Sequence, residues 1–207
     1  PDRPLMCAAG RSGAGGRRRS GVCAEGLRGF DGQRPSDCDP TETIWVPESD
    51  TVIWSMWPND TAVEVHRQTG ELVSQWGALE GSWDFEPAGV GFEMQHYPHY
   101  TDAGTLLVST HIPNQPSVHR IREFELDPVT ETLTEIWTYG EGLDLWPRYA
   151  GEAFWLHNGN VLINYGTDAR IREITHDDPP IVPELAWDSD YLLGHLTALQ
   201  ALPAIGR

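Results

Sequence analysis

The sequence contains no lysine, and all 14 of its basic side chains are arginines. Seven of them lie in residues 1–40 beside five acidic residues, which gives this segment a net charge of +2. Residues 41–207 hold the other seven arginines and 26 acidic residues, a net charge of −19. A surface with that charge repels the phosphates of DNA and RNA. We therefore expect no nucleic acid partner for this body of the chain.

Long apolar runs are also missing. No stretch approaches the roughly 20 apolar residues that a helix needs to span a bilayer, so no membrane span is expected. The first residues, PDRPLMCAAG, lack the apolar segment of a signal peptide. Because the sequence begins with proline rather than methionine, we interpret it as a processed or truncated product.

Cysteine is scarce and confined to one end of the sequence. Cys7, Cys23 and Cys38 do not have the CxxC spacing of a structural zinc site, and we expect neither a metal nor a cofactor. Residues 1–40 are rich in glycine, arginine and serine and show no strand or helix period. This composition predicts a disordered leader, and a nucleic-acid-binding tail is the alternative.

What the sequence does contain, over residues 41–207, is one pattern repeated three times. The copies begin with TETIWVPESDTVIWS, MQHYPHYTDAGTLLVS and GEAFWLHNGNVLIN. They continue with TAVEVHRQTGELVSQWG, HRIREFELDPVTETLTEIWTYG and ARIREITHDDPPIVPELAWDS, and so close on Trp76, Trp137 and Trp187. Four short strands separated by polar turns predict, in each copy, the antiparallel blade of a β-propeller.

Elementary strand chemistry supports this interpretation. The turns TDAG and HNGN contain residues that tolerate a positive φ, and the second strands VIW, LLV and VLI are apolar on both faces, as expected between stacked sheets. The closing tryptophans are predicted to pack between neighbouring blades. Because propellers typically need about four to eight blades, the predicted fold is all-β, with about three blades forming an incomplete toroid.

Three segments, taken in order, resemble the bacterial arylsulfate sulfotransferase family: QH before a turn and a strand, RIREFELDPVTETLTEIW, and GEAFWLHNGNVLINYG followed by RIREI. The resemblance covers about residues 41–203. It implies transfer of a sulfuryl group from a phenolic sulfate ester to a phenol through a histidine, with no nucleotide donor. It also implies a periplasmic or extracellular location, and it makes an aryl sulfate and a phenol the small-molecule partners. No oligomeric state follows from it.

The resemblance places the active site in the central funnel, which the first strand of each blade would line. His96 follows Gln95 in such a strand and is the predicted catalytic residue, because an imidazole can attack, shuttle a proton or donate a hydrogen bond to sulfate. The alternative is a channel-lining histidine bonded to backbone or water. Gln95, Arg120, Arg148 and Glu152 are the predicted substrate-binding residues, and Glu152 occupies in the third copy the position that matches His96.

The neighbouring histidines are weaker candidates. His99 should face away from His96 unless Pro98 bends the chain, because side chains alternate along a strand. His111 and His119 flank a loop and are expected to approach each other across a hairpin. No cysteine or carboxylate triad joins them, so a zinc site is not predicted.

Two hypotheses about function remain open. The first is the transferase, although residues 40–43 read PTET where family members have a His-x-Asn-Ser run. The second is a non-catalytic propeller that serves as a binding platform, because propellers host many unrelated functions.

Overall fold

The computed structural model describes residues 42–113, 115–143, 145–147, 149, 151–177 and 186–188. These residues form strands arranged in three sheets, and their only helices are two single-turn 3-10 helices, η2 (Trp57–Asn59) and η3 (Gly166–Asp168). The all-β prediction is confirmed. The predicted leader, residues 1–40, lies outside the described residues, and the predicted location outside the cytoplasm stays a prediction.

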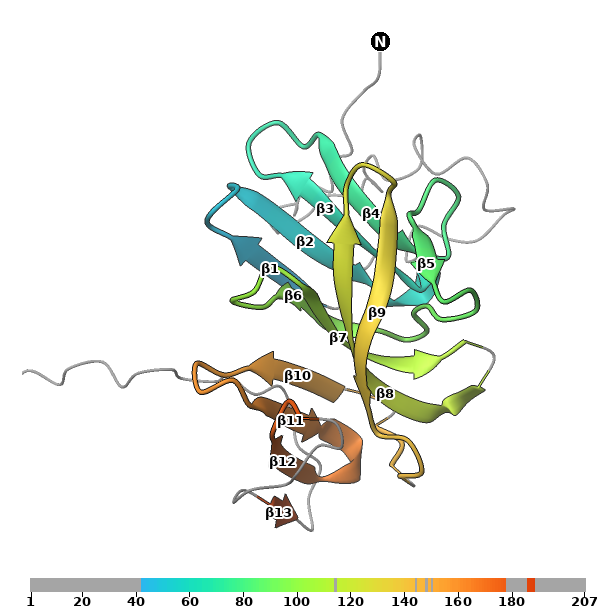
Figure 1. Cartoon of the computed structure of the whole chain (residues 1–207), viewed down its shortest axis with the longest axis vertical. Coiled ribbons are helices and arrows are strands. Elements are labelled where there is room, and N and C mark those ends of the chain that lie inside the picture. Colours follow the sequence, from blue (N-terminus) through green and yellow to red (C-terminus); the bar gives the residue numbers. More distant parts are fainter. Residues whose placement is uncertain are drawn as a thin grey trace, which may run out of the picture.

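Each predicted copy corresponds to one sheet (Figure 1). The first sheet contains, in spatial order, β1 (Glu42–Val46), β2 (Thr51–Met56), β3 (Thr61–His66) and β4 (Leu72–Gly77). The second contains β6 (His96–Tyr100), β7 (Leu106–Ile112), β8 (Gln115–Asp127) and β9 (Thr132–Tyr139). The third contains β10 (Gly151–Trp155), β11 (Val161–Tyr165), β12 (Arg170–Ile174) and β13 (Ala186–Asp188). All pairs of sequential strands within a copy are antiparallel.

One strand was not predicted. β5 (Asp84–Glu86) precedes the second copy and pairs parallel with β9 at the outer edge of the second sheet. Its three residues are too few to show an alternating pattern. Phe85 fixes it there, with its ring 5.1 Å from the ring of Phe92 and 5.6 Å from that of Phe124.

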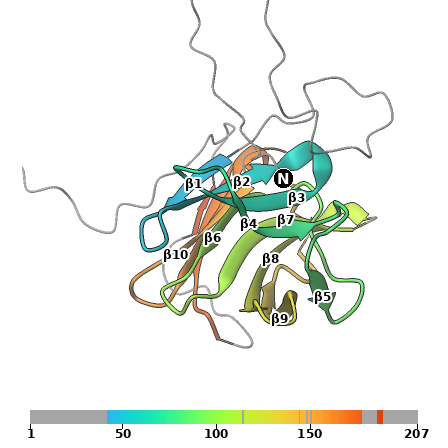
Figure 2. The ribbon, with the colours of Figure 1, turned by 90° about the horizontal axis from the view of Figure 1, so that it is seen from above.

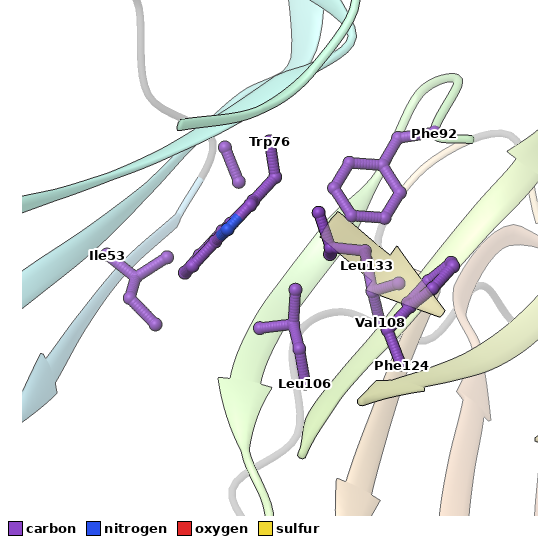
Figure 3. Packing of buried hydrophobic residues seen from close by; sticks show 8 residues of the cluster. Ile53, Trp76, Phe92, Leu106, Val108, Phe124 and Leu133 are labelled. Carbon is purple, nitrogen blue, oxygen red and sulfur yellow. The ribbon is translucent and has the colours of Figure 1, made fainter. Parts of the chain in front are cut away.

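Trp76 joins the first sheet to the second. Figure 3 shows its ring between Ile53 of its own sheet and the side chains of the second sheet, among them Leu106. The ring is fully buried and meets the ring of Tyr100 edge-on at 6.2 Å. The predicted packing of this closing tryptophan between sheets is confirmed.

Trp137 has the same place between the second and third sheets. It packs with Leu107 and Ile121 of the second sheet against Val161 and Ile163 of the third. The third closing tryptophan, Trp187, pairs in register with Ile171, but its side chain lies outside the described residues.

The three first strands, β1, β6 and β10, lie next to one another, with β6 in contact with both of the others (Figure 2). The pairing of each first strand with the second strand of its sheet shows which of their residues hold equivalent positions. Glu42 pairs with Ser55, His96 with Ser109, and Glu152 with Asn164, each at the start of a first strand. No helix among the described residues is long and apolar enough to cross a membrane.

Candidate acid–base site

The start of the three first strands brings together four side chains, Glu42, His96, Tyr97 and Glu152, which we call the first-strand site. Its centre is an ion-pair contact between two sheets, in which Nδ1 of His96 lies 2.7 Å from Oε1 of Glu42. Only 8% of each side chain is exposed. The other carboxylate oxygen of Glu42 accepts the backbone N–H of Tyr97 at 2.9 Å.

This contact determines the tautomer of His96. An ionised carboxylate can only accept hydrogen bonds, so Nδ1 of His96 must carry the proton that it shares with Glu42. In the neutral ring, Nε2 then holds the lone pair. The pair therefore has the geometry of an imidazole that is oriented by a carboxylate.

A bulge in β6 makes the second hydrogen bond of Glu42 available. The pairing with β7 shifts between His96 and His99, and Tyr97 has a φ of 50°. A bulge places two residues opposite one and turns the backbone locally. The N–H of Tyr97 consequently reaches Glu42 of the neighbouring sheet instead of the partner strand.

Tyr97 supplies a phenol beside the pair. Its ring is half-buried and packs 4.6 Å from the ring of Phe154. Burial raises the pKa of the Tyr97 hydroxyl, and the charges of Glu152 and then Glu42 raise it further. The phenol therefore remains protonated at neutral pH and can donate a hydrogen bond.

Glu152 completes the site from the third sheet. It is almost fully buried and accepts a hydrogen bond from Nδ2 of Asn164 at 3.1 Å. Its register position is the one that matches His96, as the sequence indicated. The position that His96 holds in the second sheet is thus held by a glutamate in the first sheet, Glu42, and in the third, Glu152.

The structure places two of the other predicted binding residues in structural contacts. Gln95 is fully buried, its side-chain Nε2 donates to the carbonyl of Thr61 at 2.8 Å, and its backbone carbonyl accepts from the hydroxyl of Ser55 at 3.0 Å. Arg120 donates to the carbonyls of His119 and Gly140 at 2.9 and 2.7 Å. Arg148 lies outside the described residues, and the binding roles of all three stay predictions.

His99 does not face away from His96. The bulge places His96 opposite Ser109 and His99 opposite Leu107, two positions apart on β7, so both histidines lie on one face of the sheet. The exception that the sequence left open, a bend near Pro98, is what occurs. Nδ1 of His99 lies 3.0 Å from the carbonyl of Tyr97, and burial lowers its pKa.

The expected approach of His111 and His119 is confirmed, since they pair in register with ring centroids 5.4 Å apart. Nε2 of His119 also lies 2.8 Å from the hydroxyl of Ser109. Burial lowers the pKa of His119 well below its usual value, and the charge of His111 acts in the same direction. Within the described ranges, no group of three or more His, Cys, Asp or Glu side chains is arranged to hold a metal ion.

Sequence reasoning missed the role of Glu42 and the contact of Tyr97 with it. Glu42 was considered only as part of the segment that replaces a family motif. Aligning the three copies by strand position would have found it, because it occupies the place of His96 in the first copy. The contact of Tyr97 with Glu42 could not be found in that way, since it depends on the bulge.

No family model matches the chain, and no curated protein matches it. Among solved structures, it is similar to a periplasmic gluconolactonase from Pseudomonas aeruginosa, with 14% identity, a TM-score of 0.46, and coverage of 68% of this chain and 36% of that one. It is also similar to a candidate 6-phosphogluconolactonase from Bacteroides fragilis, with 15% identity, a TM-score of 0.44, and coverage of 77% of this chain and 40% of that one. The similarity to a protein from Lactobacillus plantarum has 11% identity and a TM-score of 0.42, and it covers 81% of this chain and 44% of that one. The chain spans less than half the length of these proteins, and TM-scores this low carry no argument about activity.

The resemblance to arylsulfate sulfotransferases is wrong. No family model supports it, and three of the similar solved structures are named for lactonases instead. The segments that carried the resemblance build the blade itself: Trp137 packs between sheets, and Asn158 donates a hydrogen bond to Glu173 across the hairpin of the third sheet. Residues that build a blade do not specify a function, because one fold hosts many functions.

The transferase activity and its partners, an aryl sulfate and a phenol, are therefore wrong as well. The first-strand site gives a physical reason, because it presents the carboxylates Glu42 and Glu152 where a sulfate would need cations.

Proposed function

We propose that the first-strand site hydrolyses a small, uncharged ester by general acid–base catalysis. The observation that carries this proposal is the 2.7 Å contact between Glu42 and Nδ1 of His96, and the charge of Glu42 also reaches the hydroxyl of Tyr97, whose pKa it raises. A carboxylate that orients an imidazole, together with a separate neutral donor, is the minimum equipment for adding water to a carbonyl.

The reaction needs two steps. Nε2 of His96 takes a proton from water as the water oxygen bonds to the ester carbonyl carbon, and the carbonyl electron pair becomes an oxyanion that accepts a hydrogen bond from Tyr97. The tetrahedral intermediate then collapses, the carbon–oxygen ester bond breaks, and the leaving alkoxide takes the proton from His96. Glu42 remains ionised throughout and stabilises the imidazolium.

The charge of the site determines the substrate class. Glu42 and Glu152 repel sulfates, phosphates and carboxylates, whereas carboxylates accept hydrogen bonds readily from hydroxyl groups. The net charge of −19 over residues 41–207 acts in the same direction. An uncharged, hydroxylated ester or lactone fits these groups best.

We further propose that residues 41–207 are one propeller domain of three blades, and that these blades form an open arc. The support is internal: three sheets with one strand order, equivalent register positions and a closing tryptophan in each copy.

Proton release from δ-gluconolactone and simple neutral esters, followed with a pH indicator, tests the activity. We expect His96→Asn to lower kcat on the order of 10²–10⁴-fold, as for a lost acid–base group. His157→Ala is the matched control, because that side chain is 67% exposed on a hairpin turn and should leave the rate unchanged. Folded wild-type protein that releases no protons above the buffer rate would refute the proposal.

The substrate class is tested separately. We expect uncharged esters to react faster than their phosphorylated or sulfated analogues. Glu152→Gln should raise the rate with the anionic analogue and so reduce the ratio of the two rates. An equal preference in wild type and Glu152→Gln would show that this carboxylate does not select the substrate.

A further inference from the structure

We propose that the connection between β9 and β10 binds the ring of a neutral sugar at the rim of the first-strand site. This inference rests on the proposed function and names its substrate class, an ester or lactone of a carbohydrate. The binding surface consists of the side chains of Trp146 and Tyr149, which we call the rim aromatics.

The rim aromatics are exposed, whereas most other aromatic side chains of the described residues are at least partly buried. Trp146 is 45% exposed and Tyr149 is 52% exposed. Among the described residues, the third exposed aromatic side chain is Trp45, in β1. Packing between sheets, which explains Trp76 and Trp137, therefore does not explain the rim aromatics. Exposed apolar side chains that gather in one place mark a binding surface.

Pro147, which lies between the rim aromatics in the sequence, fixes their connection to the start of β10. Pro147 is buried, and a Cβ on Gly151 would lie 3.1 Å from its Cγ. The same Cβ would lie 3.5 Å from Nε2 of His119 in the second sheet. Because Gly151 directly precedes Glu152, the connection packs on β10 at the point where Glu152 joins the first-strand site.

Hydrogen bonds to η3 hold the backbone of both rim aromatics. The N–H of Trp146 donates to the carboxylate of Asp168. The N–H of Tyr149 donates to the hydroxyl of Thr167 at 3.4 Å, and its carbonyl accepts the N–H of Thr167 at 3.2 Å. η3 follows the end of β11 that pairs with the start of β10. The surface is therefore anchored before a ligand arrives, which lowers the cost of ordering it on binding.

Aromatic rings beside a buried carboxylate favour a sugar over other ligands. The face of an aromatic ring is negative, and the C–H groups on one face of a pyranose are apolar and weakly positive, so the two stack and remove apolar surface from water. The sugar hydroxyls can donate hydrogen bonds to the carboxylate of Glu152, which would repel a phosphate, sulfate or carboxylate. A neutral sugar has both the apolar face and the hydroxyl groups.

Binding of methyl β-D-glucopyranoside, a neutral sugar without an ester, tests the surface without turnover. Saturation-transfer NMR should show transfer from the protein to the ring protons of this sugar, and its titration gives the Kd. Trp146→Ala should raise that Kd about tenfold, as for the loss of a stacking contact. Trp45→Ala is the matched control, because Trp45 is 60% exposed and lies near the opposite end of β1 from Glu42, so the Kd should not change.

The substrate class is tested with charged and ring-free ligands. Glucose 6-phosphate should bind more weakly than the methyl glucoside, and Glu152→Gln should reduce the difference. In the proton-release assay, Trp146→Ala should raise the KM for δ-gluconolactone about tenfold and leave kcat unchanged, because stacking acts equally on substrate and transition state. Neither constant should change with ethyl acetate, which has no sugar ring.

A methyl glucoside that receives no saturation would overturn this inference, and so would equal Kd values for wild type and Trp146→Ala. Binding of benzyl alcohol in place of the sugar would assign the rim aromatics to an apolar ligand instead. Failure of the proposed function gives a different result: sugar binding without proton release would refute hydrolysis alone. Hydrolysis of ethyl acetate without sugar binding would refute the sugar-binding surface alone.

Discussion

The two boundaries between sheets use the same strand positions but different chemistry. The first boundary surrounds Trp76 with Phe92, Leu106 and Phe124, and the hydroxyl of Tyr100 donates across it to the buried carboxylate of Glu64. The second surrounds Trp137 with aliphatic residues and the buried Tyr165, and the imidazole of His176 packs 4.5 Å from the ring of Trp137. The repeat therefore fixes where the sheets meet, while the polar side chains at each boundary differ.

Glutamates on the third strands show the same divergence. Glu64 accepts hydrogen bonds from Thr51 in its own sheet and from the hydroxyl of Tyr100 in the next. Glu123, at the equivalent position, accepts from Thr105 in its own sheet and contacts His176 in the next. A phenol at one boundary is replaced by an imidazole at the other.

Removing the closing tryptophans tests whether the boundaries matter equally. Trp76→Ala should lower the free energy of unfolding by about 3–5 kcal/mol, because a fully buried aromatic side chain leaves a cavity. Trp137→Ala should lower the free energy of unfolding by less, because Trp137 is 8% exposed. Urea unfolding measures both, and a larger loss for Trp137→Ala would reverse the ranking of the two boundaries.

The glycines that follow the closing strands sharpen the comparison. A Cβ on Gly77, which has a φ of 134°, would lie 2.2 Å from the carbonyl oxygen of Asp60, whereas one on Gly140 would lie 3.1 Å from that of His119. Gly77→Ala should therefore destabilise the protein by roughly 2–4 kcal/mol, more than Gly140→Ala. Gly104→Ala controls for backbone strain alone, since its φ is 81° and no atom lies within 4 Å. Equal losses of unfolding free energy in the three variants would show that the contact of the added Cβ with a carbonyl oxygen plays no part.

Tyr100→Phe tests the hydrogen bond across the first boundary. It removes one donor to the buried carboxylate of Glu64, which lies 2.8 Å from the hydroxyl, and keeps the ring against Trp76. We expect a loss of about 1–3 kcal/mol in the free energy of unfolding, the usual cost of an unsatisfied buried group. A variant as stable as wild type would mean that Thr51 alone satisfies this carboxylate.

Sequence predicted the parts of the fold that depend on local pattern. The turn chemistry and the apolar second strands located the copies, and the closing positions of Trp76 and Trp137 located the boundaries between sheets. β5 was missed because three residues have no period and their pairing with β9 is long-range. The features that were predicted correctly concern the packing of the sheets, which the repeated pattern determines.

The candidate site was only half predictable. His96 was found because it stands in a first strand, and the match of Glu152 to it follows from counting positions. Its partnership with Glu42 depends on the contact of two sheets, and Tyr97 reaches the same carboxylate only because β6 is bulged. The resemblance misled because blade-building segments carry fold and not chemistry.

A mild drop in pH should have the smallest effect, and it should act at the second boundary. His99, half-buried, and His119, buried, lie there with folded-state pKa values below the usual 6.5. Between those lowered values and about 6.5 the unfolded chain binds more protons, so stability rises with pH in this window and is constant above it for these two groups. His96, His111 and Arg120 add positive charge near His119 and strengthen the effect. Urea unfolding from pH 7.5 to 5.5 should show this slope, and His119→Gln should reduce it, whereas His157→Ala, on an exposed turn, should not. A slope that His119→Gln leaves unchanged would exclude His119 as its source.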